Sequence, residues 1–211
     1  MTARIHEIYR RLQHHFGPQH WWPGETKLEI TVGALLTQNT NWRNVEKAMA
    51  NLRDHQLLSL PALTAIPTDL LAHHLIPAGY YNLKAHRLKN LIAAIGPEDD
   101  DLEIFLAADL YQLREKLLAV KGIGPETADA IILYAAEKPS FVIDAYTHRV
   151  LLRHDLIGEE TDYYEMQDLF LAALPADVVL YNEYHALLVR LGKEFCLKNK
   201  PRCGACPLAG L

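Results

Sequence analysis

The chain has 211 residues, of which half are apolar and 22% are charged, so it can bury a sizeable core and is too apolar for a disordered protein. Its net charge of −5 excludes a uniformly basic surface, although a local basic patch remains compatible with nucleic-acid binding. No apolar run approaches the roughly 18 residues of a membrane helix, and the N-terminus lacks a signal-type segment. We therefore expect a soluble, cytoplasmic protein with no membrane partner.

The periodicity of the apolar residues is helical along almost the whole chain. No segment shows convincing strand alternation, and the best candidate, residues 141–143, is too short to matter. Asn41 is suited to cap one of the helices, and the fold class is therefore all-α. The pattern predicts helices over 4–16, 27–37, 41–53, 59–65, 67–75, 82–95, 101–108, 109–119, 125–137, 145–155, 162–173, 176–192 and 204–209.

The run LLTQNT, at the end of residues 27–37, contains a polar turn whose side chains suggest a function. Gln38 and Asn39 lie there between two apolar helices, and side-chain amides at a turn can occupy the gap left in a DNA duplex when a base is removed. The tryptophans Trp21, Trp22 and Trp42 all lie near these turns, and aromatic rings can stack on a flipped base. Ordinary packing between helices explains each tryptophan equally well when it is taken alone.

The stretch KGIGPETA (121–128) joins two predicted helices through a glycine-rich turn. Glycine adopts the unusual backbone angles of such a turn at little cost, and Pro125 suits the first position of the second helix. Free N–H groups at such a turn form an anion site that binds a phosphate. An ordinary helical hairpin accounts for this stretch equally well, and Glu126 also suits the helix dipole.

Asp144 follows three apolar residues and precedes a helical pattern. Its carboxylate can cap that helix by accepting backbone N–H groups, which is the better explanation for the residue in isolation. The functional alternative is a partly desolvated carboxylate that stabilises positive charge or activates water.

All the cysteines of the chain fall within its last sixteen residues, as Cys196-x6-Cys203-x2-Cys206. In a cytosolic protein this clustering favours a metal or a cluster over disulfides, and thiolates suit zinc or iron–sulfur. A closed site needs a fourth ligand. Three structural thiols are the remaining alternative.

Basic residues gather in two segments despite the negative net charge. Residues 190–202 carry five basic side chains against one acid, and residues 80–89 carry Lys84, Arg87 and Lys89 with no acid. The acids concentrate at 98–103 and 159–168, so a surface that is basic on one side is compatible with the composition.

Taken together, these stretches resemble the endonuclease III superfamily of helix-hairpin-helix DNA glycosylases. LLTQNT, PAGYYNLKAHRL (77–88), KGIGPETA, Asp144 and the cysteine run follow one another in the family order. The resemblance implies two all-α lobes, a six-helix domain at 27–138 and a lobe made from 1–26 and 139–211, with a cluster loop at 196–211. It also implies a nucleoid-associated monomer that flips a damaged base out of double-stranded DNA into the cleft between the lobes.

Within the superfamily, WWPG, LLTQNT, PAGYYN and GIGPETAD resemble the 3-methyladenine glycosylase branch. Bifunctional members carry a lysine where this chain has Glu126, and an amine can form an imine with the sugar whereas a carboxylate cannot. The resemblance thus implies a monofunctional base excision repair enzyme that hydrolyses N-alkylated purines from DNA and leaves an abasic site. One alternative is a glycosylase for oxidised pyrimidines or mismatched bases, and another is a non-catalytic helix-hairpin-helix DNA-binding protein.

The resemblance also gives roles to particular residues. Asp144 would stabilise positive charge on the sugar and orient water, and Glu126 is a candidate helper in that step. The base pocket and the wedge that enters DNA would consist of Trp22, Pro23, Gln38, Asn39 and Trp42, with Trp42 as the stacking face. The contacts to DNA phosphates would come from Lys84, Lys121, Gly122, Gly124, Lys198, Lys200 and Arg202.

A cofactor follows from the same resemblance. Cys196, Cys203 and Cys206 would hold a structural [4Fe–4S] cluster that keeps the basic loop 197–202 against DNA phosphates. The family spacing places the fourth cysteine one residue beyond Leu211, outside this sequence. Zinc is the second choice, and some members of the alkylpurine branch lack the cluster altogether.

Overall fold

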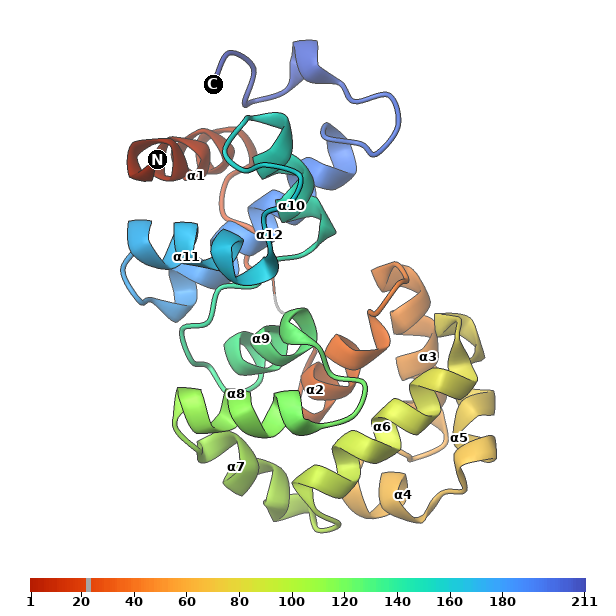
Figure 1. Ribbon diagram of the computed structural model, residues 1–211. Coiled ribbons are helices and arrows are strands. Elements are labelled where there is room, and N and C mark those ends of the chain that lie inside the picture. The colour runs from red at the N-terminus through yellow and green to blue at the C-terminus, as the bar shows by residue number, and fades with distance from the viewer. Residues whose placement is uncertain (22–23) are drawn as a thin grey trace. The chain divides into compact units, whose positions relative to one another are not determined.

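The computed structural model describes residues 1–21 and 24–211, and all the regular structure in these residues is helical, which confirms the all-α class (Figure 1). Among the described helices, none combines the length and the apolar composition that crossing a bilayer requires. The α-helices are α1 (Thr2–Phe16), α2 (Lys27–Leu36), α3 (Trp42–Asp54), α4 (Leu60–Ala65), α5 (Thr68–His74), α6 (Tyr81–Ile95), α7 (Asp99–Ala107), α8 (Leu110–Ala119), α9 (Pro125–Tyr134), α10 (Ala145–Arg153), α11 (Tyr163–Ala173) and α12 (Val178–Glu194). The 3-10 helices are η1 (Ile76–Ala78) and η2 (Cys203–Ala205).

The contacts between Cα atoms divide the chain into two compact units. One unit combines Met1–Trp21 with Pro139–Leu211, so both chain ends belong to it, and the other comprises Trp22–Lys138. We call them the terminal unit and the central unit.

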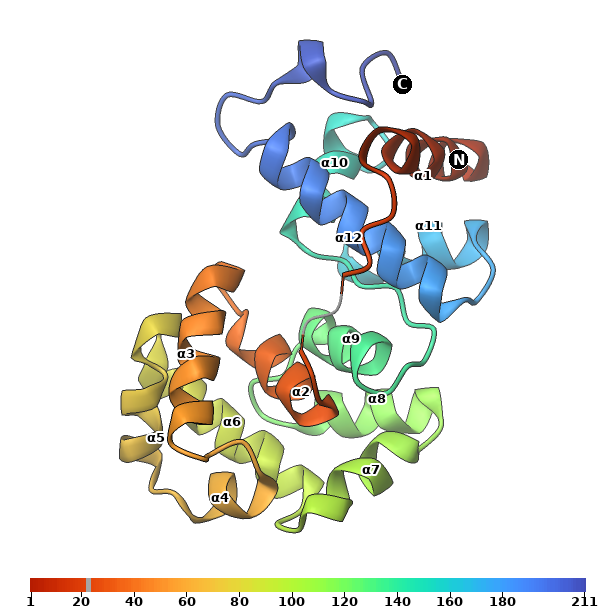
Figure 2. The same cartoon turned by 180° about the vertical axis from the view of Figure 1, so that it is seen from behind.

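Helix α2 lies at the core of the central unit, where it contacts α3, α6 and α9 (Figure 2). Its sequence is apolar on nearly every side, and Ile30, Val32 and Leu35 are buried. The Thr26 side chain caps α2 by accepting the N–H of Glu29. Asn41 caps α3 in the same way, as the sequence predicts.

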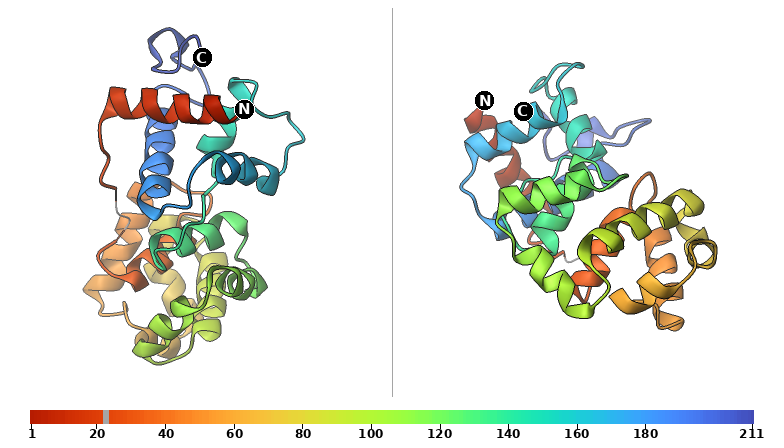
Figure 3. Two further views of the ribbon diagram at one scale, coloured as in Figure 1. Left: turned by 90° about the vertical axis from the view of Figure 1, so that its left-hand side faces the viewer. Right: turned by 60° about the horizontal axis from the view of Figure 1, so that its bottom comes forward.

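Helix α12 holds the terminal unit together, because α1 and α10 both pack on it (Figure 3). The rings of Tyr9 on α1 and Tyr184 on α12 lie 5.1 Å apart, and the buried Tyr184 hydroxyl donates to the carbonyl of Ile5 at 2.8 Å. Phe141 stacks on Phe170 of α11 with ring centroids 3.9 Å apart. Aromatic side chains therefore fill much of this core.

Two predicted helices differ most from the structure: one is absent and one is shorter than expected. The helix expected over 204–209 is absent: a 3-10 turn covers Cys203–Ala205 and Cys206 is extended, because a residue before a proline is pushed out of the helical region. The helix expected over 125–137 ends at Tyr134, and the chain then turns at Glu137 with a φ of 51°. Pro139 follows that turn, so the chain leaves helical geometry ahead of it.

Candidate active-site residues

The helices α8 and α9 of the central unit form the predicted hairpin around the KGIG turn. Pro125 occupies the first turn of α9, as expected. Gly122 has a φ of +102°, and a Cβ there would overlap with Cγ of Arg87, so this position requires glycine. Gly124 has a φ of −101°, and a Cβ added to it would meet no other atom within 4 Å, so its role is not conformational.

The hairpin turn is fastened to the rest of the central unit by Gln38. Its side-chain amide donates to the carbonyl of Gly122 at 3.1 Å and to the Thr127 hydroxyl at 3.0 Å. Arg87 in turn donates to the Gln38 side-chain oxygen at 2.5 Å. The Gln38 side chain is thus committed to the hairpin and does not project as the expected wedge, whereas Asn39 is exposed with a φ of 53°.

A buried ion pair joins the two helices of the hairpin. The Arg114 guanidinium on α8 donates to both carboxylate oxygens of Asp129 on α9, at 2.8 and 3.1 Å. The Asp129 side chain is completely buried, and a bidentate pair of this kind fixes the geometry of both partners. The turn between α8 and α9 is therefore held on both sides.

Lys84 corrects the expected set of phosphate-binding residues. Its side chain is 1% exposed, and its ammonium donates to the carbonyls of Leu36 and Ala78 at 2.8 and 2.7 Å. Burial and, to a lesser degree, the charge of Arg87 lower the pKa of Lys84 to about 8. The residue stabilises the ends of α2 and η1 from inside the unit and cannot reach a phosphate.

The other predicted site residues of the central unit that the structure describes lie at its surface or are half-buried. Glu126 is exposed in the first turn of α9, and Lys121 is exposed in the hairpin turn. Trp42 is half-buried at the start of α3, and its indole lies over Gly33 of α2, where a Cβ would be 3.4 Å from the ring. Trp22 and Pro23 lie outside the described residues.

Asp144 of the terminal unit caps a helix, as expected, and its carboxylate is also largely buried. It is the N-cap of α10, since its Oδ1 accepts the N–H of Thr147 at 2.7 Å. Its side chain is only 12% exposed, and Oδ2 lies 3.5 Å from Nε2 of His185 on α12. Burial by itself raises the pKa of Asp144, but His185 and the Thr147 N–H outweigh burial, so the pKa lies below its ordinary value.

His185 is not among the site residues expected from the sequence. It occupies the buried stripe of α12 beside Tyr184 and Leu188, and the Trp21 ring lies 6.4 Å from its imidazole. The only sign of His185 in the sequence is that a histidine stands within the apolar stripe of a predicted helix. Its proximity to Asp144, which lies 41 positions earlier in the chain, is visible only in three dimensions.

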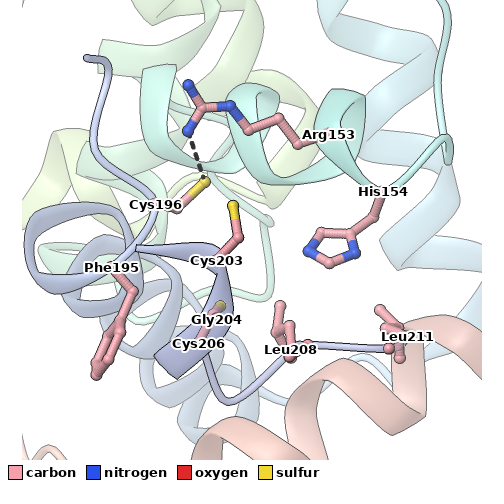
Figure 4. A pocket seen from close by; sticks show the side chains of 11 residues that line it. Arg153, His154, Phe195, Cys196, Cys203, Gly204, Cys206, Leu208 and Leu211 are labelled. Atoms are coloured by element: carbon pink, nitrogen blue, oxygen red, sulfur yellow. Dashed lines mark hydrogen bonds between the residues drawn. The ribbon is translucent and has the colours of Figure 1, made fainter. Parts of the chain in front are cut away.

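The three cysteines line one cavity of about 440 Å³ in the terminal unit, next to Arg153 and His154 (Figure 4). Within the described part of the chain, no three His, Cys, Asp or Glu side chains converge closely enough to hold a single metal ion. The donor set consists of soft sulfur ligands, which fit zinc or iron–sulfur chemistry. The thiols therefore line the same cavity but do not converge on one point.

The basic loop next to this cavity is tied to α10 by two arginines. Arg153 donates to Cys196 Sγ at 3.3 Å and to the carbonyls of Leu197 and Lys198 at 2.8 and 3.1 Å. Arg149 donates to the Cys196 carbonyl at 2.7 Å. The backbone of the loop is fixed by these bonds, while three side chains are exposed: Lys198, Lys200 and Arg202.

A helical hairpin, a capping aspartate downstream of it and a terminal cysteine run define a helix-hairpin-helix DNA repair protein. The chain belongs to the HhH-GPD superfamily of base excision DNA repair proteins, whose family model matches residues 32–175, and it is a DNA glycosylase of this superfamily. The "Putative DNA repair glycosylase MJ1434" of Methanocaldococcus jannaschii is 45% identical over 206 residues, which are 97% of this chain and 93% of that protein.

Two solved structures show the same fold. The 3-methyladenine DNA glycosylase MagIII of H. pylori, bound to 1,N6-ethenoadenine, has a TM-score of 0.79 and 32% identity, over 90% of this chain and 97% of that one. A non-covalent endonuclease III–DNA complex has a TM-score of 0.83 over 98% and 92% of the two chains. At 18% identity, the second similarity concerns the fold alone. The resemblance to the endonuclease III superfamily is thus confirmed.

Proposed function

We propose that the chain is a monofunctional glycosylase that hydrolyses N-alkylated purines of the 3-methyladenine type from duplex DNA. The observation that carries this proposal is the absence of an amine at the family's lysine position, together with a shielded aspartate in the terminal unit. Glu126 lies in the first turn of α9, at the position where bifunctional members of the family carry an imine-forming lysine, and Asp144 is a shielded carboxylate with a lowered pKa. Water is then the nucleophile, and an abasic site is the product.

Asp144 supplies the charge that the reaction needs. As the bond between sugar and base breaks, positive charge develops on the sugar, and a fixed carboxylate in a shielded position stabilises it. The Thr147 N–H occupies Oδ1, so Oδ2 is the oxygen that faces the reacting sugar and its water. The lowered pKa keeps this carboxylate ionised at neutral pH.

The substrate class follows from the leaving group and from Trp42. An N-alkylated purine such as 3-methyladenine is cationic and leaves as a neutral base, so it needs little help from a general acid. A cation over an indole gains about 0.5–2 kcal/mol, depending on how well it is desolvated. The half-buried ring of Trp42 is the proposed stacking face, and the similarity to the H. pylori 3-methyladenine glycosylase supports this choice.

Binding of the DNA backbone is assigned to two surfaces. The N-terminus of α9, with Gly122, Gly124 and Lys121 in the turn before it, offers backbone N–H groups and the positive end of a helix dipole to a phosphate. In the terminal unit, the exposed residues Lys198, Lys200 and Arg202 form a second phosphate-binding surface. Asn39 is the amide that would enter the duplex.

We also infer that Cys196, Cys203 and Cys206 hold a [4Fe–4S] cluster, because their thiols line one cavity and are soft ligands. The cluster would fix the loop that carries the basic residues. Anaerobically purified protein should contain about four iron and four sulfide per chain and absorb in the visible region. Stoichiometric zinc, or no metal in folded protein, would contradict this assignment.

The experiment that tests the proposed substrate class is identification of the released base. Methylated DNA and oligonucleotides carrying 1,N6-ethenoadenine, thymine glycol or a G·T mismatch are incubated with the protein, and free bases are separated by chromatography. Release of 3-methyladenine as the fastest reaction supports the proposal. Faster release from thymine glycol or the mismatch supports the pyrimidine alternative, and binding without any release supports a non-catalytic module.

A further inference from the structure

The two oxygens of the Asp144 carboxylate have different partners in the terminal unit. Oδ1 is engaged by the backbone N–H of Thr147 as part of the helix cap. Oδ2 lies 3.5 Å from Nε2 of His185, and both side chains are largely buried, at 12% and 8% exposure. A capping aspartate needs only one oxygen, so the contact with His185 is additional to the cap.

The secondary structure fixes where His185 stands relative to Asp144. Asp144 begins α10, and α10 packs along α12. His185 lies on the buried stripe of α12 together with Tyr184 and Leu188. Because the surroundings are packed, its imidazole has little freedom to rotate away from Asp144. The contact joins two packed helices and does not depend on a loop.

Two charged groups on these helices have partners elsewhere. On α10, Arg149 donates to the Cys196 carbonyl at 2.7 Å. On α12, Glu183 accepts a backbone N–H from the segment after α1, and from α1 the ring of Tyr9 packs against α12. His185 is therefore the titratable group that faces Asp144 most directly.

We propose that His185 is a positioning residue for Asp144, whose Nε2–H holds Oδ2 and so orients the carboxylate toward the reacting sugar. This inference rests on the proposed glycosylase function. The distance of 3.5 Å is long for a hydrogen bond, as is common for catalytic contacts in a protein without its substrate. Fixed orientation matters because a carboxylate displaced from the developing charge stabilises it less.

The proposal has a consequence for the pH dependence of base release. The Nε2–H favours the ionised form of Asp144, so its removal makes the carboxylate easier to protonate. Without His185, the acid limb of the pH profile should therefore move to higher pH. A residue that only fills space in the core would leave this limb unchanged when it is replaced.

The first arm of the test measures the contact without any DNA. The ring Nε2–H proton of His185 is observed by NMR in the wild-type protein and in Asp144→Asn, with the signal assigned by its loss in His185→Gln. Asn preserves the cap, so the helix remains capped. An Nε2–H proton signal that is shifted downfield in the wild-type protein and moves upfield in Asp144→Asn supports the contact. A signal at the same position in both proteins overturns the proposal.

The second arm measures single-turnover release of 3-methyladenine across a pH series. His185→Leu should slow release at least about tenfold and shift the acid limb upward, and His185→Gln, which retains an N–H donor, should recover part of both effects. His6→Leu, at an exposed position of α1, is the control. Slow release with an unshifted acid limb in His185→Leu overturns the positioning role.

The two arms separate this proposal from the proposed function. If the wild-type protein releases no base from any lesion, the glycosylase function fails while the NMR arm still reports on the contact. If the wild-type protein is active and the NMR signal of His185 does not depend on Asp144, only the proposed role of His185 fails. Circular dichroism of each variant ensures that only folded protein is compared, and Gln provides the fallback should Leu not fold.

Discussion

At the scale of single residues, Asp144 caps α10, and in the proposed mechanism the same carboxylate also carries the chemistry. Asp144→Asn keeps an oxygen for the Thr147 N–H and removes the charge. Base release should therefore fall about a hundredfold or more, while DNA binding and thermal stability change little. Single-turnover kinetics and a binding titration measure both effects.

Asp109→Asn is the matched control, because the Asp109 carboxylate also caps a helix, α8, by accepting backbone N–H groups and lies outside the proposed site. It should leave base release unchanged. Full activity of Asp144→Asn would refute the catalytic assignment.

Lys84 allows a prediction about stability. Lys84→Met removes the donor to the carbonyls of Leu36 and Ala78, and leaving them unpaired should cost about 1–3 kcal/mol. The pKa of Lys84 is lowered to about 8 in the folded protein and is near 10.4 in the unfolded chain, so the folded state loses its proton first.

Because the unfolded state then holds more protons, the contribution of Lys84 to stability rises between about pH 8 and pH 10. The difference in unfolding free energy between wild-type and Lys84→Met should widen over this range in urea titrations. A constant difference would show that the ammonium is not desolvated as the structure implies.

The roles of Lys84 and His185 show what the sequence could not provide. Lys84 stands in a basic segment, which suggests a phosphate ligand, yet it is spaced with Leu88 and Leu91 on the buried stripe of α6. The spacing could be recognised in the sequence, but the carbonyls that accept hydrogen bonds from the buried Lys84 ammonium belong to other helices. The relation of His185 to Asp144 depends on the packing of two helices that are distant in sequence.

At the scale of elements, the hairpin depends on one glycine. Gly122→Ala would place a Cβ at a φ of +102° and against the Arg87 side chain. It should destabilise the protein by about 1–3 kcal/mol and weaken DNA binding, because the turn that presents its N–H groups must shift. Thermal unfolding and a DNA-binding titration test both effects.

Gly158→Ala is the control for this substitution, since a Cβ there meets only the Thr161 hydroxyl at 3.9 Å. It should change stability by no more than about 0.5 kcal/mol. Equal effects of the two substitutions would contradict the role assigned to the hairpin turn.

The helices themselves were largely predictable, because apolar spacing and capping residues such as Asn41 and Asp144 mark where they lie. The two predicted helices that differ most from the structure lie next to prolines. Cys206 precedes Pro207 and is extended, so a sequence that reads as a short helix becomes a 3-10 turn. The two hydrogen bonds that Gln38 donates to the hairpin join residues that are 84 and 89 positions apart and have no local signal in the sequence.

At the scale of the whole molecule, the net charge is −5 and binding to DNA depends on local charge. Affinity for duplex DNA should fall steeply with salt. Replacing Lys198, Lys200 and Arg202 by alanine should reduce the slope of log affinity against log salt by up to about 3. Lys116→Ala, at an exposed position of α8, should change the slope by less. An unchanged slope in the triple variant would exclude this loop from the interface.

The most direct test of the central claim is strand integrity after base release. DNA containing 3-methyladenine is incubated with the protein and divided between samples with and without alkali, and a third sample receives borohydride. Water as the nucleophile predicts released base, strand breaks only after alkali, and no trapped covalent complex. Glu126→Lys, which restores an amine at that position, is the positive control for trapping. Strand breaks without alkali, or a trapped complex with the wild-type protein, would contradict the account.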